Sequence, residues 1–264
     1  MTRAGDSIMS GDIYLAASAA LAYEKRLETT ANNLANINTA GFKRDQVAFQ
    51  AYMLSAAGTP VPVQPPFTAA GATESFWVEY RSHTDFSPGP QRRTGNPLDL
   101  SLNGKGFFNV QSPEGTLYTR RGNFTLDPEG MLVTQEGWPV MGDGGEIRVE
   151  GGGAERMARE ITVGEDGTVH VNGSAVGRLL ISASDDPGGL TKIGGCYFKA
   201  EGAEPVPLED ASVAQGYLEM ANVEAVQMLT EMIEIMRGYE SYQRVIRTID
   251  ELNAKSIADV GRTS

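Results

Sequence analysis

Apolar residues recur three and four positions apart near the beginning of the chain, from about Gly11 to Asn38. The seam positions are Ile13, Ala16, Ala20, Tyr23, Leu27, Leu34 and Ile37, with Thr30 in the remaining place. This spacing puts them on one side of an α-helix and predicts a helix with a single apolar seam. Gly41 can adopt the left-handed conformation that closes a helix, so we expect the helix to end near residues 36–40.

The same spacing returns over a longer stretch, from about Ala214 to Val260. Its seam positions are Ala225, Met228, Met232, Ile235, Tyr239, Tyr242, Ile246 and Ile249, and Leu229, Ile233, Met236 and Val245 widen the apolar face. About 40 helical residues form a rod of about 60 Å, far longer than a typical globular helix, and such a rod needs partners along its length. Gly238 is either tolerated there at a cost of about 1 kcal/mol or marks a close contact.

Between these two stretches the pattern changes to short alternating segments separated by turns. Residues 58–66 are rich in proline and cannot continue a helix, so we place a domain boundary there. From Asn96 onward, leucines alternate with polar residues, and pairs such as Asn103–Gly104 and Asn172–Gly173 predict tight turns. We therefore expect an antiparallel β domain, with its aromatic residues in the core.

These patterns predict an α+β fold in which paired N- and C-terminal heptad helices form a helical stalk with an inserted antiparallel β domain. The expected parts are an N-terminal helix in residues 1–44, an extended linker in 45–95, the β domain in 96–200, a return linker in 201–215 and the long C-terminal helix in 216–264. Seams at both ends, with a second apolar face on the longer helix, suit the stacking of subunits.

Composition removes several classes of function. The 264 residues include 22 Lys or Arg and 34 Asp or Glu, which gives a net charge of −12, so we expect no binding to nucleic acid. The single cysteine, Cys196, excludes an intramolecular disulfide, and the two histidines lack the spacing of zinc ligands. We expect no metal and no cofactor. No uncharged apolar run reaches about 20 residues, so we expect no direct insertion into a membrane.

Residues arranged for catalysis are not evident either. The glycine-rich loops lack the spacing that cradles phosphate, and the pattern Gly-x-Ser-x-Gly is absent. Cys196 lies in an apolar stretch typical of a buried, inert thiol. The beginning of the chain superficially resembles a secretory signal peptide, but Asp6 and Asp12 interrupt its leading region and the seam continues past any cleavage point. We expect no enzymatic activity.

Residues 31–43, ANNLANINTAGFK, resemble the signature of the flagellar basal-body rod proteins. The resemblance continues in residues 94–108 (TGNPLDLSLNGKGFF), 118–140 (YTRRGNFTLDPEGMLVTQEGWPV) and 215–226 (QGYLEMANVEAV). It implies a structural subunit that assembles helically with copies of itself and with other flagellar rod proteins. It also implies export through the flagellar type III export apparatus without a cleaved signal peptide, and a place in the basal-body rod within the periplasm.

Several alternatives remain open within and outside this family. Residues 22–28, AYEKRLE, are more similar to the proximal-rod type, whereas residues 215–220 are similar to the distal-rod type. A hook-type axial protein, a stalked secreted β-domain adhesin and an enzyme with a hidden pocket are the other candidates. Family members usually begin shortly before the equivalent of Ile13, so either residues 1–8 are an extension or Met9 is the natural start.

The candidate functional residues are those of the two seams and of the signature. The signature asparagines either bond to nearby backbone at the helix end or reach a neighbouring subunit. We expect Phe42 to latch onto the helix pair and Ile235 to be removed from water by assembly. The expected assembly residues are Ile13, Leu27, Asn32, Asn33, Leu34, Asn36, Asn38, Gly41, Phe42, Met228, Met232, Ile235, Tyr239, Tyr242, Ile246 and Ile249.

Overall fold

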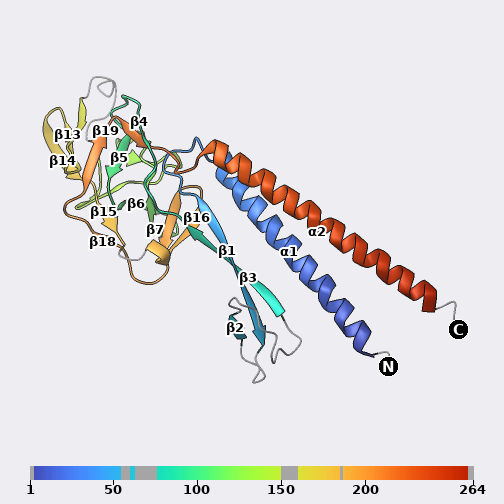
Figure 1. Cartoon of the computed structure of the whole chain (residues 1–264). Coiled ribbons are helices and arrows are strands. Elements are labelled where there is room, and N and C mark those ends of the chain that lie inside the picture. The colour runs from blue at the N-terminus through green and yellow to red at the C-terminus, as the bar shows by residue number, and fades with distance from the viewer. Residues whose placement is uncertain (1–2, 55–59, 63–75, 150–159, 185–186, 261–264) are drawn as a thin grey trace. The chain divides into compact units, whose positions relative to one another are not determined.

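The computed structural model describes residues 3–54, 60–62, 76–149, 160–184 and 187–260 (Figure 1). The chain divides into two compact units. We call the first the helical unit; it is formed by residues 1–34, 45–83 and 224–264. We call the second the β unit; it is formed by residues 35–44 and 84–223. Long helices and many antiparallel strands together give the predicted α+β fold.

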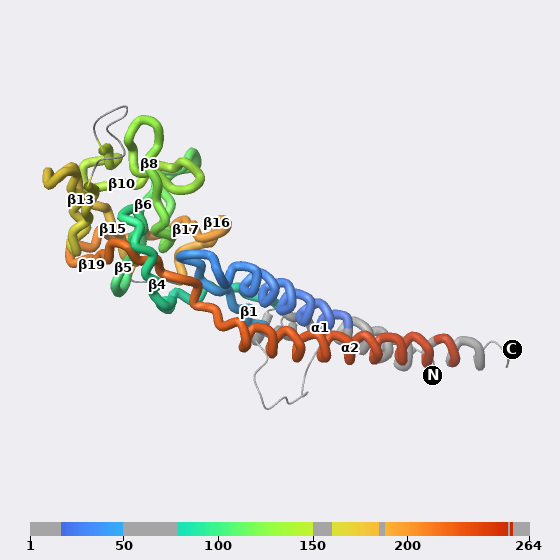
Figure 2. Tube along the Cα trace, turned by 90° about the horizontal axis from the view of Figure 1, so that it is seen from above, coloured from blue at the N-terminus to red at the C-terminus, as the bar shows by residue number. Residues whose placement is uncertain are grey.

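Two long helices dominate the helical unit. Helix α1 (Arg3–Ala35) and helix α2 (Ala225–Val260) lie side by side and run in opposite directions, in Figure 1 and in the view turned by 90° in Figure 2. Helix α1 ends one residue before the expected range. Helix α2 begins about ten residues later than we expected, because the preceding residues pair with strands of the β unit instead.

The helical unit also contains a small sheet where we expected an extended linker. Its strands are β1 (Asp45–Leu54), β2 (Pro60–Pro62) and β3 (Phe76–Thr84), in the order β2–β1–β3. Strand β1 pairs with β2 in the antiparallel sense, with Tyr52 opposite Pro62. The proline-rich residues 58–66 thus include a short strand at a sheet edge, a position where the missing N–H of proline is tolerated.

Where the structure describes it, the β unit is built from short strands and a 3₁₀ turn. They are β4 (Gln91–Arg93), β5 (Leu100–Asn103), β6 (Phe107–Ser112), β7 (Gly115–Thr119), β8 (Thr125–Leu126), β9 (Leu132–Val133), β10 (Met141–Gly142), β11 (Gly145–Glu146), β12 (Ile161–Val163), β13 (Thr168–Val171), β14 (Ser174–Arg178), β15 (Ile181–Ala183), η2 (Pro187–Gly189), β16 (Leu190–Gly194), β17 (Tyr197–Ala200), β18 (Val206–Pro207), β19 (Ser212–Gln215) and β20 (Tyr217–Glu219). The largest sheet has the order β16–β17–β7–β6–β15–β18, and β12–β13–β14 form a second.

Strands from both ends of the β unit pair with each other. Strand β19 pairs with β5, with Gln215 opposite Leu100, and β20 pairs with β4, with Glu219 opposite Gln91. The unit therefore extends well beyond the expected range of 96–200. A domain cut at those limits would leave β5 without the backbone partners that satisfy its edge.

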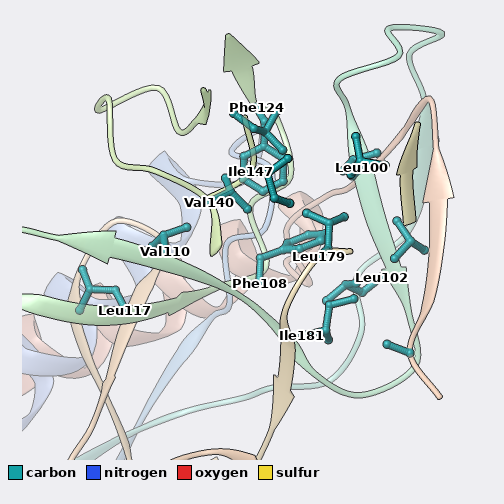
Figure 3. Close-up of a cluster of buried hydrophobic side chains, with 14 of the residues drawn as sticks. Leu100, Leu102, Phe108, Val110, Leu117, Phe124, Val140, Ile147, Leu179 and Ile181 are labelled. Atoms are coloured by element: carbon teal, nitrogen blue, oxygen red, sulfur yellow. The ribbon is translucent and has the colours of Figure 1, made fainter. Parts of the chain in front are cut away.

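The main core of the β unit is an apolar cluster (Figure 3). Its members include Leu100, Leu102, Phe108, Val110, Leu117, Phe124, Val140, Ile147, Leu179 and Ile181. A smaller cluster contains Phe107, Tyr118, Leu190 and Phe198. The interpretation of the aromatic residues as core is confirmed for Phe107, Phe108, Tyr118 and Phe124, while Trp138 is half-buried against the main cluster.

Candidate assembly surfaces

The two helices contact each other closely around Tyr23. Its ring lies 5.5 Å from the ring of Tyr242, measured between centroids. A Cβ atom at position 238 would collide with the Tyr23 ring, so Gly238 is a close-contact point rather than a merely tolerated glycine. The Arg26 guanidinium pairs with the Glu231 carboxylate, Nη2 to Oε1, at 3.2 Å. The seam of α2 therefore faces α1.

Seam residues of α2 are covered to different degrees within the single chain. Met228 and Ile235 are buried, and Ile235 is only 1% exposed. Leu27 of α1 is half-buried, as are five seam residues of α2: Met232, Tyr239, Tyr242, Ile246 and Ile249. The expectation that assembly removes Ile235 from water is thus wrong, because the subunit itself already covers this side chain. Ile13 lies in α1, but its side chain is outside the described residues.

A second set of apolar side chains on α2 is left exposed. Val226, Leu229, Ile233 and Met236 follow each other three and four positions apart and are between 47% and 78% exposed. At 100° per residue they lie about 110° around the helix from the seam. We call these four residues the outer stripe. Val245 and Leu252, further along α2, are exposed as well.

The signature asparagines differ in exposure: Asn33 is buried, Asn36 is half-buried, and Asn32 and Asn38 are exposed. Asn33 is 4% exposed and makes two hydrogen bonds with one residue: its Nδ2 donates to the Asp45 carbonyl at 2.8 Å, and its Oδ1 accepts from the Asp45 N–H at 2.9 Å. Asn36 accepts from the Thr39 hydroxyl at 3.2 Å. These two side chains therefore bond within the chain. Asn32 and Asn38 are exposed, and Leu34 is half-buried.

The Gly-Phe pair that follows belongs to the β unit. Gly41 has a φ of 70°, and a Cβ atom there would lie within 2.5 Å of three backbone atoms of Arg120 and Arg121. Phe42 is buried, and the Lys192 ammonium lies 4.0 Å from the centre of its ring, a cation–π contact. The chain enters the β unit at residue 35, so Phe42 belongs to that unit, and the expectation that it latches onto the helix pair stays a prediction.

One group of buried charges was not predicted from the sequence. Lys43 Nζ lies 2.6 Å from Glu219 Oε1, and Arg120 Nη1 lies 3.1 Å from Glu219 Oε2. We call these three residues the ion cluster. The same cations also donate to backbone carbonyls, Lys43 to Ser87 at 2.7 Å and Arg120 to Gly104 at 2.6 Å.

The ion cluster joins three of the segments that carry the family resemblance. Lys43 is followed by Arg44, and Arg120 by Arg121, so nothing in the local sequence marks these cations as buried. Burial lowers the pKa of Lys43 and that of Arg120, and the Glu219 carboxylate opposes both shifts by favouring the charged forms. The Glu219 carboxylate thus stabilises the charged forms of both buried side chains.

The described part of the chain holds no constellation suited to chemistry. It contains no group of three His, Cys, Asp or Glu side chains placed to hold a metal ion. Cys196 is buried, and burial raises the pKa of its thiol to about 11, so the reactive thiolate is scarce at neutral pH. Within the same residues, no helix is long and apolar enough to cross a membrane.

Three family models match separate parts of the chain. Residues 13–43 match the model described as flagella basal body rod protein, and residues 101–171 match the D1 domain of flagellar hook protein FlgE/F/G. Residues 214–259 match the C-terminal region of the flagellar basal body rod FlgEFG protein. The first and last matches cover most of the two helices, and the middle one lies in the β unit.

Full-length relatives agree with these matches. The chain is 35% identical to a flagellar basal-body rod protein FlgF of Caulobacter vibrioides, over 96% of this chain and 99% of the relative. It is 34% identical to a FlgF of Rhizobium meliloti, with the same coverage. It is 31% identical to a flagellar basal-body rod protein FlgG of Bacillus subtilis, over 92% of this chain and 97% of that protein.

Proposed function

This chain belongs to the family of flagellar basal-body rod proteins and is a structural subunit of the basal body, not an enzyme, and we propose that it polymerises helically through its terminal helices. In this role it helps to form the drive shaft between the basal body and the hook. The observation that carries the proposal is the outer stripe, four apolar side chains that the single chain leaves in water.

Burial of the outer stripe would stabilise the assembled rod. Covering a large apolar side chain contributes about 1.5 to 3 kcal/mol, so four per subunit form a substantial surface when copies stack. The stripe follows the helical spacing that a neighbouring helix would match. We propose that these contacts join this chain to copies of itself and to other rod proteins, and that the exposed Asn32 and Asn38 lie at the same interfaces.

We further propose that α1 and α2 form a coiled-coil stalk. The Tyr23–Tyr242 ring contact, the Arg26–Glu231 ion pair and the buried Ile235 support this, since all belong to or border the two heptad seams. In this scheme the seams hold the subunit together, and the outer stripe binds its neighbours. The proposed assembly residues are thus divided between contacts within a chain and contacts between chains.

The position in the rod is proposed to be proximal. We take FlgF as the proximal-rod type and FlgG as the distal-rod type. The FlgF relatives, at 35% and 34% identity, match over nearly the full length of both chains and support the proximal position. The FlgG relative, at 31% identity, supports the distal-rod alternative. We propose that the subunit passes through the flagellar type III export apparatus without a cleaved signal peptide and assembles in the periplasm.

Electron microscopy of basal bodies from cells that lack this protein tests the proposal. A proximal subunit should leave basal bodies whose rod stops short of the outer rings, and expression of the wild-type chain should restore full length. A rod that stops only near its hook end would favour the distal alternative. Rods of normal length in the deletion strain would contradict the proposed function.

A further inference from the structure

Three distant segments of the β unit meet at the carboxylate of Glu219. Lys43 is 176 positions away from it, and Arg120 is 99 positions away. The Gly89 N–H also donates to Glu219 Oε1, at 3.0 Å. Lys43 lies in the segment that follows α1, and Glu219 lies in β20, shortly before α2 begins. The carboxylate is therefore a junction between the two ends of the β unit.

The charges at this junction do not balance pairwise. Two cations share one anion, and the side chains of Lys43 and Glu219 are only 1% and 2% exposed. Removing a charge from water is costly, and the cost is offset only when a counter-charge and hydrogen bonds are in place. Without Glu219, Lys43 and Arg120 would both be buried without the carboxylate that contacts them.

Uncharged contacts join the same two segments. The Gly41 N–H donates to the Glu219 carbonyl at 2.7 Å, and the Arg44 N–H donates to Asn222 Oδ1 at 2.8 Å. The Asn222 amide donates in turn to the Asp85 carbonyl at 2.8 Å. Residues 40–44 and residues 217–222 thus complete each other's hydrogen bonds at several points.

We propose that the ion cluster is a coupling device: residues 40–44 and residues 217–222 dock on the β unit together or not at all. Without residues 217–222, Lys43 and Arg120 are buried without the Glu219 carboxylate. Without residues 40–44, Glu219 keeps Arg120 but loses Lys43, and its carbonyl loses the hydrogen bond from the Gly41 N–H. Docking of either segment alone is therefore less favourable than docking of both. Because β20 (Tyr217–Glu219) is the last described strand of the β unit, the unit closes only after the chain has been made as far as residue 219. This coupling acts within a single chain and requires no neighbouring subunit.

Equilibrium unfolding of full-length variants tests the coupling, with Trp138 fluorescence as the probe in a Trp77→Phe background. Lys43→Met leaves one balanced pair, so it should lower the folding equilibrium constant by less than about tenfold. Glu219→Gln leaves two cations and should lower it by more than about a hundredfold. The double variant Lys43→Met/Arg120→Met leaves Glu219 without either cation. It should lower the folding equilibrium constant by a larger factor than the product of the factors of the two single variants.

Two control substitutions match these changes at exposed sites of the same unit. Lys105→Met and Glu201→Gln should leave the folding constant unchanged within about twofold. If Glu219→Gln does not fold, the triple variant Lys43→Met/Arg120→Met/Glu219→Met should recover folding, since it buries no charge. Purely additive effects of the two cation substitutions, or a triple variant as unstable as Glu219→Gln, would overturn the proposal.

Amide hydrogen exchange distinguishes coupling from a merely local role. In Lys43→Met, the amides of Gly41 and Met220 should lose protection by the same factor; Met220 donates to the Pro90 carbonyl at 2.9 Å, beyond β20. The Leu132 amide, bonded to the Ile147 carbonyl at 3.0 Å, should keep its protection. Loss of protection at Gly41 alone would show that the two segments dock independently.

Discussion

Gly238 of α2 lies so close to Tyr23 of α1 that a Cβ atom at position 238 would stand within 3.0 Å of three atoms of the tyrosine ring. One helical turn further, Tyr242 packs against the same ring. The glycine leaves the space into which Tyr23 fits, and Tyr242 holds the ring there. The approach of the two helices thus depends on a matched pair of residues.

Gly238→Ala should destabilise the chain despite the higher helix propensity of alanine. In an exposed helix the substitution would be favourable by about 1 kcal/mol. Here the added methyl group must displace the Tyr23 ring, and overpacking of this kind costs about 1 to 3 kcal/mol. Urea unfolding followed by helical circular dichroism measures the net change in the free energy of unfolding.

The background Tyr23→Ala provides the control for this prediction. With the ring removed, Gly238→Ala should raise the free energy of unfolding by about 1 kcal/mol, because only the helix propensity remains. A change of the same sign in both backgrounds would mean that the ring and the glycine do not constrain each other.

Asn33→Ala should weaken the junction between α1 and β1. The substitution removes two hydrogen bonds at a buried position and leaves the Asp45 N–H and carbonyl without these partners. The expected loss in the free energy of unfolding is about 1 to 3 kcal/mol. Asn38→Ala, at an exposed position of the same signature, should change it by less than about 0.5 kcal/mol. Equal effects at both sites would argue against the local role of Asn33.

Ionisation of Cys196 should reduce stability at alkaline pH. Burial raises the pKa of this thiol to about 11 in the folded chain, from 9.0 without burial. The folded state therefore binds the thiol proton of Cys196 more tightly than the unfolded state does. The contribution of this protonated thiol to the free energy of unfolding is complete below pH 9.0 and is lost as pH rises through about 11. The stability difference between wild type and Cys196→Ala should change by roughly 2 to 3 kcal/mol over this range. Parallel pH profiles of the two proteins would contradict it.

The sequence predicted both helices because each has a long seam that satisfies one helical period. It failed at the start of α2, because Gln215 and Glu219 are held in strands by partners at Leu100 and Gln91. Such pairing over more than a hundred residues overrides local pattern, and nothing in the local sequence specifies it. The same reason explains why the β unit exceeds its expected limits.

The candidate site was only partly predictable. The outer stripe was visible as a widening of the apolar face of α2, but spacing alone did not show which face α1 covers. Ile235 is buried and Ile233 is exposed, although both are isoleucines in nearby positions of one helix. The ion cluster was hidden for another reason: a buried lysine is recognised only when its carboxylate partner is known.

The contrast between Ile235 and Ile233 separates folding from assembly. Ile235→Asp places a carboxylate among buried apolar side chains and should lower the free energy of unfolding of the free subunit by about 3 kcal/mol or more. Ile233 is 52% exposed, so Ile233→Asp should change it by less than about 0.5 kcal/mol. Urea unfolding of the two purified variants measures both values, and equal losses would contradict the assigned faces of α2.

Assembly through the outer stripe is tested most directly by counting the rods on basal bodies from cells that carry Ile233→Asp, using electron microscopy. If the outer stripe binds neighbouring subunits, the variant should fold normally but build no stable rod, since a carboxylate replaces an apolar contact at every copy. Glu234→Gln, the exposed neighbour, should give rods of normal length. Rods of normal number and length in the Ile233→Asp strain would show that the outer stripe is not the assembly surface.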